Sequence, residues 1–295
     1  MTLAEEYRRS LKMAEAEELL DLLIYRLVAF VLVKVLYHLP ITPNQMTYAS
    51  LAAGLLSAME FAQGTDAGFR WGAVWYAAAN VLDCGDGMLA RLKHSGTPLG
   101  RLVDGVVDWI SSIAIFFGLG MGMSAYFGSS WYWLPAVAAG IVSGYHAMAF
   151  DKRQQEYITA VRGEEDFTQR ETAKIEREIL NTRSSARRVI LSLYMWYMRT
   201  QQHSMHKGTA AGCTPTLYRL HNRRIMRWWT WLGPTTNRTL LIVAGLLARP
   251  DWFCWLVIAP TNFYLVGLLR WQRRINTRVC NESERPAPAS VHVST

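Results

Sequence analysis

The chain has 295 residues, of which 51% are hydrophobic and only 18% are charged, below the roughly 25% charged residues usual in soluble domains. Its net charge of +8 suits anionic lipid, nucleic acid or the basic loops of a membrane protein. The four cysteines are scattered, without the paired spacing of a zinc site or a disulfide framework, so we expect free thiols. This composition argues against an ordinary soluble domain and favours a protein with membrane helices.

The first apolar segment, residues 19–39, is interrupted by Asp21, Arg26 and Lys34. A helix that crosses a bilayer rarely carries three charges, whereas an amphipathic helix in the headgroup region keeps its charges in water. We therefore favour an N-terminal amphipathic interfacial helix, with a membrane span as the alternative.

Further apolar segments approach the ~20 residues that a helix needs to cross a bilayer. The last two are divided by ARPD, a sequence typical of a tight turn. The predicted fold class is all-α, a polytopic membrane protein with six transmembrane helices that follow the interfacial helix. The predicted spans are 45–63, 71–91, 101–127, 131–150 and a closing pair within 237–272.

Lysine and arginine gather in the loops on one side of this predicted bundle, and the insert between the fourth and fifth spans is strongly basic. The positive-inside rule therefore places both termini and the insert in the cytoplasm. The predicted units are an interfacial helical region (1–39), a membrane core (40–150), a basic helical insert (151–236), the last two transmembrane helices (237–275) and a disordered tail (276–295).

Four aspartates, Asp83, Asp86, Asp104 and Asp108, lie in two neighbouring apolar segments. An ionised carboxylate inside a membrane helix costs about 2.5–3.5 kcal/mol on insertion scales, so four of them imply a function or a bound cation. Asp83 and Asp86 are one helical turn apart, and Asp104 and Asp108 share a helix face. The connection LKHSGTP is short, so we expect the two helices to pack antiparallel with their carboxylates converging. Such oxygen-only ligands suit Mg²⁺ or Mn²⁺.

The pattern D-x2-D-G-x2-A-R-x8-G-x3-D-x3-D runs from Asp83 to Asp108, and TPNQMT occupies Thr42–Thr47. The first pattern resembles the signature of the CDP-alcohol phosphatidyltransferases at every fixed position, and the second resembles the family's TPN-x-x-T entry to the first span. The resemblance implies a six-helix membrane enzyme, often a homodimer, whose site opens to the cytoplasm.

The resemblance also implies roles for individual residues. Asp83, Asp86, Asp104 and Asp108 would hold two divalent cations, Mg²⁺ or Mn²⁺, around the pyrophosphate of the donor, and Asp108 would be the general base. The residues that would surround the cytidine nucleotide are Asp83, Gly87, Ala90, Arg91 and Gly100.

The signature defines the donor nucleotide but not the alcohol. We favour transfer of a phosphatidyl group from CDP-diacylglycerol to a soluble alcohol of the inositol phosphate, glycerol phosphate or serine type, with release of CMP. The alternative transfers a phospho-headgroup of the choline, ethanolamine or inositol type from a CDP-linked alcohol to a lipid hydroxyl. Lys152, Arg153 and Arg238 are candidates for binding an acceptor phosphate, and they equally suit the basic flanks of membrane helices.

Two other protein classes account for parts of this pattern. A cation transporter would use the intramembrane carboxylates, but it has no need of Gly87, Ala90, Arg91 and Gly100 at these spacings. A nucleic-acid binder would use the basic insert, whose sequence LYRLHNRRIMRWWTWLG equally suits anionic headgroups or a solvated helical cap. We therefore expect an enzyme whose partners are a CDP-linked donor, an alcohol acceptor and membrane lipid, without nucleic acid.

Overall fold

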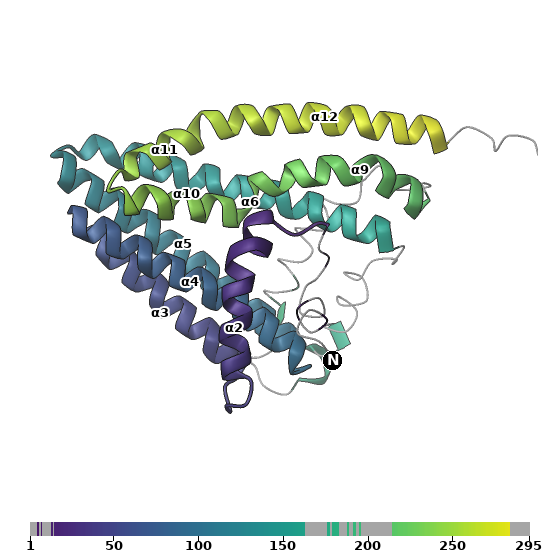
Figure 1. Cartoon of the computed structure of the whole chain (residues 1–295), viewed down its shortest axis with the longest axis horizontal. Helices are drawn as coiled ribbons and strands as arrows, with labels where there is room; N and C mark the ends of the chain where they lie inside the picture. Colours follow the sequence, from purple (N-terminus) through teal and green to yellow (C-terminus); the bar gives the residue numbers. More distant parts are fainter. Residues whose placement is uncertain are drawn as a thin grey trace, which may run out of the picture.

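The computed structural model describes residues 15–162 and 214–283, together with a few isolated residues outside these ranges. This part of the chain is helical and contains no strand, which confirms the predicted all-α class (Figure 1). Most of the first half of the predicted basic insert, and most of the predicted disordered tail, lie outside the described residues.

Within each described range the helices follow one another through short connections, several of which place proline in the first helical turn. Two connections contain short 3₁₀ turns, η2 (Ser130–Tyr132) and η3 (Thr230–Leu232). The remaining elements are the π-helical turn η1 (Asp21–Tyr25), α2 (Arg26–Leu36), α3 (Pro43–Ala62), α4 (Asp66–Leu92), α5 (Pro98–Phe127), α6 (Trp133–Arg162), α9 (Pro215–Trp229), α10 (Pro234–Leu246), α11 (Pro250–Ile258) and α12 (Pro260–Ser283).

In the part of the chain that the structure describes, three helical stretches are long and apolar enough to cross a membrane: Gly100–Phe127, Ser130–Val161 and Pro250–Val279. Large apolar side chains on these stretches point outward; Ile113 is 64% exposed and Ile141 is 70% exposed, as expected for helices that face lipid. The chain is therefore an integral membrane protein. The full count of six spans remains a prediction.

The predicted closing pair of helices is divided differently from the expectation. The ARPD turn is present, with Ala248 at a φ of 54° and α11 beginning at Pro250. A second interruption separates α11 from α12 at Pro260, because proline lacks the N–H that would continue the helical hydrogen bonds. The helix before the turn, α10, has only 13 residues, fewer than the ~20 that a perpendicular span requires.

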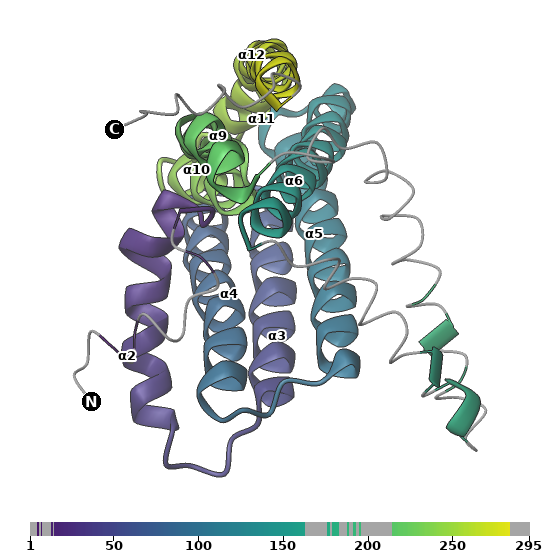
Figure 2. The same cartoon turned by 90° about the vertical axis from the view of Figure 1, so that its right-hand side faces the viewer.

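The helices form two layers (Figure 2). In one layer α2, α4, α3 and α5 lie side by side, and the other contains α6, α9, α10, α11 and α12. The layers are joined by a buried apolar cluster that includes Phe61, Phe69, Leu241 and Phe253. In Figure 1 the layers approach each other at the left and diverge toward the right, where α4 and α5 are connected.

Helix α3 lies between α4 and α5, so the two aspartate-bearing helices flank it instead of packing face to face as the short connection predicted. Small residues make this possible. A Cβ atom on Gly118 of α5 would lie 2.2 Å from the carbonyl oxygen of Ala58, and one on Gly122 would lie 1.8 Å from that of Phe61. Only glycine allows the backbones of α3 and α5 to approach this closely.

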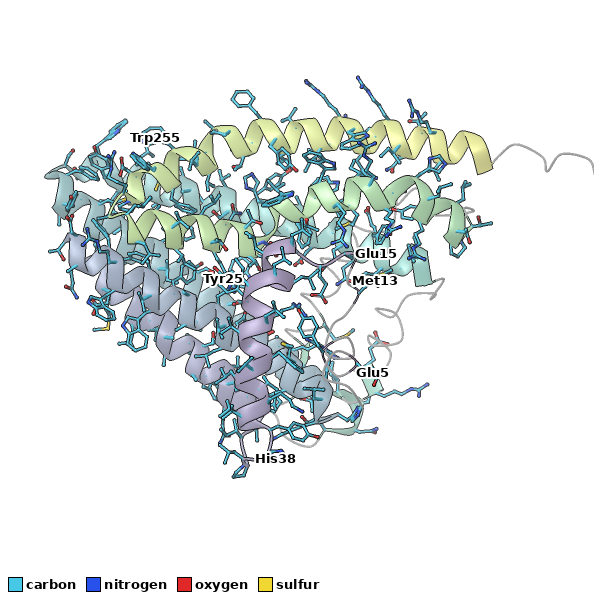
Figure 3. The ribbon with its side chains drawn as sticks, in the orientation of Figure 1. Glu5, Met13, Glu15, Tyr25, His38 and Trp255 are labelled. Atoms are coloured by element: carbon cyan, nitrogen blue, oxygen red, sulfur yellow. The ribbon has the colours of Figure 1, made fainter. Side chains whose placement is uncertain are left out.

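The N-terminal helix α2 packs on α4 through Ala29, Phe30 and Val33, which are buried beside Met88 and Leu89. Its opposite face is apolar and exposed; Val31 is 65% exposed and Val35 is 68% exposed. Tyr25, the residue just before α2, lies where the start of this helix approaches α10 (Figure 3). Placement of this helix in the membrane interface remains a prediction.

Candidate active site

The connection between α4 and α5 is shaped by local hydrogen bonds. Helix α4 ends at Leu92, and His94 turns the chain at a φ of 50°. Thr97 then caps α5, because its Oγ1 accepts a hydrogen bond of 3.0 Å from the amide of Gly100. Lys93 fixes the connection to the preceding loop by donating to the carbonyl oxygens of Leu39 and Ile41 at 3.0 and 2.9 Å.

Three aspartates converge on the two sides of this connection: Asp83 and Asp86 before it on α4, and Asp104 after it on α5. Each offers a carboxylate oxygen, and these three oxygens lie within 4.8 Å of one another. Asp86 is only 5% exposed, and Oδ1 of Asp104 is buried without a hydrogen-bond partner. Converging carboxylates and an unpartnered buried oxygen fit a hard divalent cation, which takes oxygen ligands. The predicted convergence of the two aspartate pairs is therefore found for three of the four residues.

Thr47 of α3 contacts one of these three carboxylates, that of Asp86. Its hydroxyl donates to Oδ2 of Asp86 at 2.5 Å, and the threonine is itself buried. The helix is started by a capping box in which Thr42 accepts from the amide of Gln45 and the Gln45 side chain accepts from the amide of Thr42. The sequence identified Thr42–Thr47 only as a family-like entry, without a role for Thr47. The sequence signal for this role was the spacing of Thr47 from the capping residue Thr42, which places Thr47 about one turn into α3.

Arg238 of α10 joins the two aspartate helices. Its Nη1 donates to Oδ2 of Asp83 at 2.8 Å and to Oδ1 of Asn80 at 2.9 Å, while its Nη2 donates to Oδ1 of Asp108 at 2.8 Å. Asp108 therefore contacts a guanidinium group and is not one of the three residues that converge within 4.8 Å. Asn80, one turn before Asp83, was missed by the sequence analysis because one amide in an apolar helix gives no specific signal.

The residues predicted to surround a nucleotide continue from the carboxylates along α4 and α5. A Cβ atom on Gly87 would lie 3.4 Å from Nη1 of Arg91, so the arginine folds back over the glycine. Ala90 is half-buried on the same helix. On α5, a Cβ atom on Gly100 would lie 3.2 Å from Oδ1 of Asn44, at the start of α3. The two glycines therefore leave room for the Arg91 side chain on α4 and for Asn44 beside the cap of α5.

Residues 40–177 match the family model described as CDP-alcohol phosphatidyltransferase. These residues are a CDP-alcohol phosphatidyltransferase domain. The chain is also 33% identical, over 89 residues, to the archaetidylinositol phosphate synthase of Pyrococcus horikoshii. That match covers 30% of this chain and 46% of the relative, so the chain spans about half the length of this curated relative.

CDP-alcohol phosphatidyltransferases are membrane phosphotransferases that bind a CDP-linked donor and an alcohol acceptor and use divalent metal ions. The match is therefore to a family of phosphotransferase enzymes, in agreement with the resemblance of the aspartate pattern. Asp83, Asp86 and Asp104 each offer one carboxylate oxygen that could bind such an ion, and the matched region contains all four aspartates.

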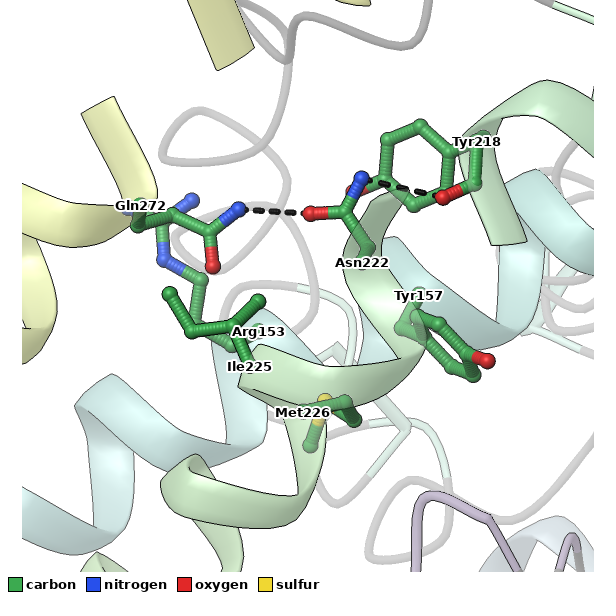
Figure 4. A pocket seen from close by; sticks show the side chains of 7 residues that line it. All are labelled: Arg153, Tyr157, Tyr218, Asn222, Ile225, Met226 and Gln272. Atoms are coloured by element: carbon green, nitrogen blue, oxygen red, sulfur yellow. Dashed lines mark hydrogen bonds between the residues drawn. The ribbon is translucent and has the colours of Figure 1, made fainter. Parts of the chain in front are cut away.

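The basic residues proposed from sequence for an acceptor phosphate occupy different environments. Arg238 lies among the aspartates, whereas Arg153 of α6 donates to Glu156 at 2.6 Å and lies 5.8 Å from the ring centre of Trp229. Arg153 lines a narrow pocket between α6, α9 and α12, beside a hydrogen bond from Gln272 to Asn222 (Figure 4). Lys152, its neighbour on α6, is half-buried. The structure therefore brings only Arg238 into contact with the signature residues through a described ion pair.

Proposed function

We propose that the protein transfers a phosphatidyl group from CDP-diacylglycerol to the hydroxyl of a soluble polar alcohol, of the inositol phosphate, glycerol phosphate or serine type, and releases CMP. The observation that carries this proposal is the convergence of three signature carboxylates beside an arginine that pairs with Asp108. The name of the Pyrococcus relative, a synthase of archaetidylinositol phosphate, supports an acceptor that contains inositol and phosphate.

In this proposal the signature residues bind the donor. Asp83, Asp86 and Asp104, with Asp108 as a fourth candidate, hold two divalent cations, Mg²⁺ or Mn²⁺. When bound, such ions neutralise the charge of the pyrophosphate and stabilise the phosphate that leaves. Arg91 offers a forked donor to a phosphate.

Around these ligands, the small residues Gly87, Ala90 and Gly100 allow the cytidine nucleotide to approach the backbone. Support for this comes from the contact between Gly87 and the Arg91 guanidinium group, which would hold a phosphate of the nucleotide next to the glycine.

Asp108 acts as the general base. It takes the proton from the acceptor hydroxyl while the hydroxyl oxygen forms a bond to the phosphorus that carries diacylglycerol. The bond from that phosphorus to the bridging pyrophosphate oxygen breaks, and CMP leaves with this oxygen. Arg238 holds one oxygen of Asp108 and so limits its rotation. A phosphate on the acceptor would have a cation close to the base, so of the three acceptor-phosphate candidates we now place Arg238 ahead of Lys152 and Arg153.

We also propose that both termini, the active site and the 151–236 insert face the cytoplasm, and that the enzyme is a homodimer. The orientation is supported by the gathering of basic residues after the helices that carry the site. This arrangement keeps the lipid tails of the donor in the bilayer while the nucleotide enters from water.

The test is an assay of purified protein in lipid nanodiscs with Mg²⁺ or Mn²⁺ and a mixed pool of alcohols. One arm contains CDP-diacylglycerol labelled in its acyl chains, and the other contains CDP-choline, CDP-ethanolamine or CDP-inositol labelled in the headgroup, with diacylglycerol. Mass spectrometry of the products then shows which part of the donor enters the new lipid. We expect acyl label in a new phospholipid, together with free CMP. Headgroup label in the new lipid would instead establish the alternative, transfer of a phospho-headgroup to a lipid hydroxyl. Intact donors in both arms would contradict the proposed enzyme.

A further inference from the structure

The start of α10 is capped by a carboxyl group from the other end of the chain. Glu18, which is 4% exposed, accepts hydrogen bonds from the amides of Thr235 and Thr236 at 3.2 and 3.1 Å. The residue at the cap position itself, Gly233, has no side chain to supply this contact. A glycine is required at position 233, because a Cβ atom there would lie 2.2 Å from Cδ of Glu18. Glu18 therefore satisfies amide groups that the helix start leaves without partners.

Two further side chains of the same segment contact α10. Asp21 accepts from the hydroxyl of Thr235 at 3.1 Å, and the Tyr25 hydroxyl lies 3.0 Å from that of Thr239. Residues 18, 21 and 25 are spaced so that they share one helical face. Glu18–Tyr25, which we term the N-terminal strap, thus follows the first turns of α10 (Figure 3).

The N-terminal strap also contacts α4 next to the active site. The Cys84 thiol lies 3.5 Å from Oδ1 of Asp21, and Cys84 directly follows the signature residue Asp83. The strap consequently links the start of α10 to the part of α4 that carries the first carboxylates. This link is an addition to the matched family domain, since both the strap and α10 lie outside residues 40–177.

Arg238 connects the start of α10 to the signature aspartates Asp83 and Asp108. It follows the capped turn directly and adjoins Thr239, which the strap also contacts. Its two nitrogens each donate at 2.8 Å, one to Asp83 and the other to Asp108. Because both bonds are made by one rigid planar group, a small shift of the start of α10 would break at least one of them.

We propose that Glu18 is a positioning residue, which fixes the start of α10 so that Arg238 holds Asp83 and Asp108 in their reactive arrangement. This inference rests on the proposed function. Glu18 is distant from the signature in sequence and takes no part in the transfer itself. It acts through Arg238.

The chemical state of Glu18 suggests how to test this role. Burial raises the pKa of Glu18 to about 8, so the carboxyl group is mostly protonated at neutral pH. A glutamine at this position is also neutral and keeps one acceptor oxygen, whereas an alanine keeps none. Glu18→Gln therefore removes part of the hydrogen bonding that caps α10, and Glu18→Ala removes all of it, without either substitution adding a charge.

The experiment combines hydrogen exchange with a double-mutant cycle in nanodiscs. In Glu18→Ala we expect faster amide exchange at Thr235 and Thr236, and a fall in kcat/KM of roughly 10²-fold, the size of effect that a misplaced catalytic group produces. Glu18→Gln should fall between alanine and wild type in both measurements. In the Arg238→Ala background, Glu18→Ala should cause little further loss, since the residue it positions is absent.

Glu17→Ala is the matched control, because Glu17 is equally buried but its ion pair is made with Arg26, at 2.7 Å. It should leave exchange in the first turn of α10 at the wild-type rate. If Glu18→Ala does not fold, Tyr25→Phe removes only one hydroxyl contact and should give a smaller loss of activity that disappears in the Arg238→Ala background.

Independent, multiplicative losses in the Glu18 and Arg238 variants would overturn the positioning role, as would full activity in a Glu18→Ala protein whose α10 start exchanges freely. Failure of the proposed function is distinguishable, since the wild-type protein would then show no transfer while its exchange pattern at Thr235 and Thr236 still depended on Glu18.

Discussion

Replacing Arg238 by lysine keeps the positive charge on α10 but removes the fork that joins the two aspartate helices. The guanidinium group donates to Asp83 and Asp108 from different nitrogens, each at 2.8 Å. A lysine ammonium group is a compact point charge and cannot reproduce this bridge. We therefore expect Arg238→Lys to keep a contact to one carboxylate and to lose the other.

The size of the effect follows from the bond that is lost. A hydrogen bond to a charged group contributes about 1.5–3 kcal/mol in proteins. The Arg238 side chain is 15% exposed and that of Asp83 22% exposed, so the Asp83 contact is weakly screened; Asp108 is 41% exposed and is screened more. If the bridge is needed in the transition state, the loss of one contact lowers kcat/KM by roughly 10- to 150-fold.

The assay is CMP release from CDP-diacylglycerol in nanodiscs with saturating acceptor. Arg249→Lys is the matched control, because Arg249 also forms a two-nitrogen contact to a carboxylate, that of Asp251, at the turn before α11. That contact is exposed and remote from the signature residues in sequence, so the control should keep the wild-type rate. A wild-type rate in Arg238→Lys, or an equal loss in Arg249→Lys, would refute the bridging role.

Three further substitutions test other parts of the structure. Asp108→Asn should abolish CMP release while equilibrium dialysis still shows donor binding; retained turnover would remove Asp108 as the base. Thr47→Val removes the hydrogen bond to Asp86 and should weaken Mn²⁺ affinity, followed by electron paramagnetic resonance, by about 10- to 100-fold, with unchanged affinity as the contrary result. Gly122→Ala overpacks α3 against α5 and should lower the free energy of unfolding in detergent by more than about 2 kcal/mol, whereas Gly105→Ala, with no atom within 4 Å of the added carbon, should not.

The sequence predicted the helical class and the convergence of the aspartates because both depend on local patterns. Apolar runs define the helices, and the spacing of Asp83, Asp86 and Asp104 places their carboxylates on helix faces that a short connection brings together. The packing order was not predictable in the same way. A short connection limits the distance between two helix ends, but it does not reveal that a third helix, α3, will separate them.

Contacts between distant segments were the other part that the sequence did not reveal. Arg238 was singled out as basic and near a helix start, but its partners on α4 and α5 could not be identified from its own neighbours. Glu18 gave no signal at all, because its cap is completed by the amides of Thr235 and Thr236. Side-chain pairs of this kind depend on the tertiary arrangement and have no periodicity.

In the proposed metal site, the position of α3 between α4 and α5 would give this helix influence over ion selectivity, although it supplies none of the three converging carboxylates. The gap between Asp86 and Asp104 is set by how closely each neighbour rests on α3, and that depends on residues such as Gly54, where an added Cβ would meet Oγ of Ser111 at 2.9 Å. A methyl group there would wedge α5 outward and enlarge the oxygen cage. Mg²⁺ requires oxygen atoms at about 2.0–2.1 Å, whereas Ca²⁺ accepts about 2.3–2.6 Å. Substitutions on the ligand-free face of a spacer helix thus offer a way to retune the preferred ionic radius while leaving every aspartate unchanged.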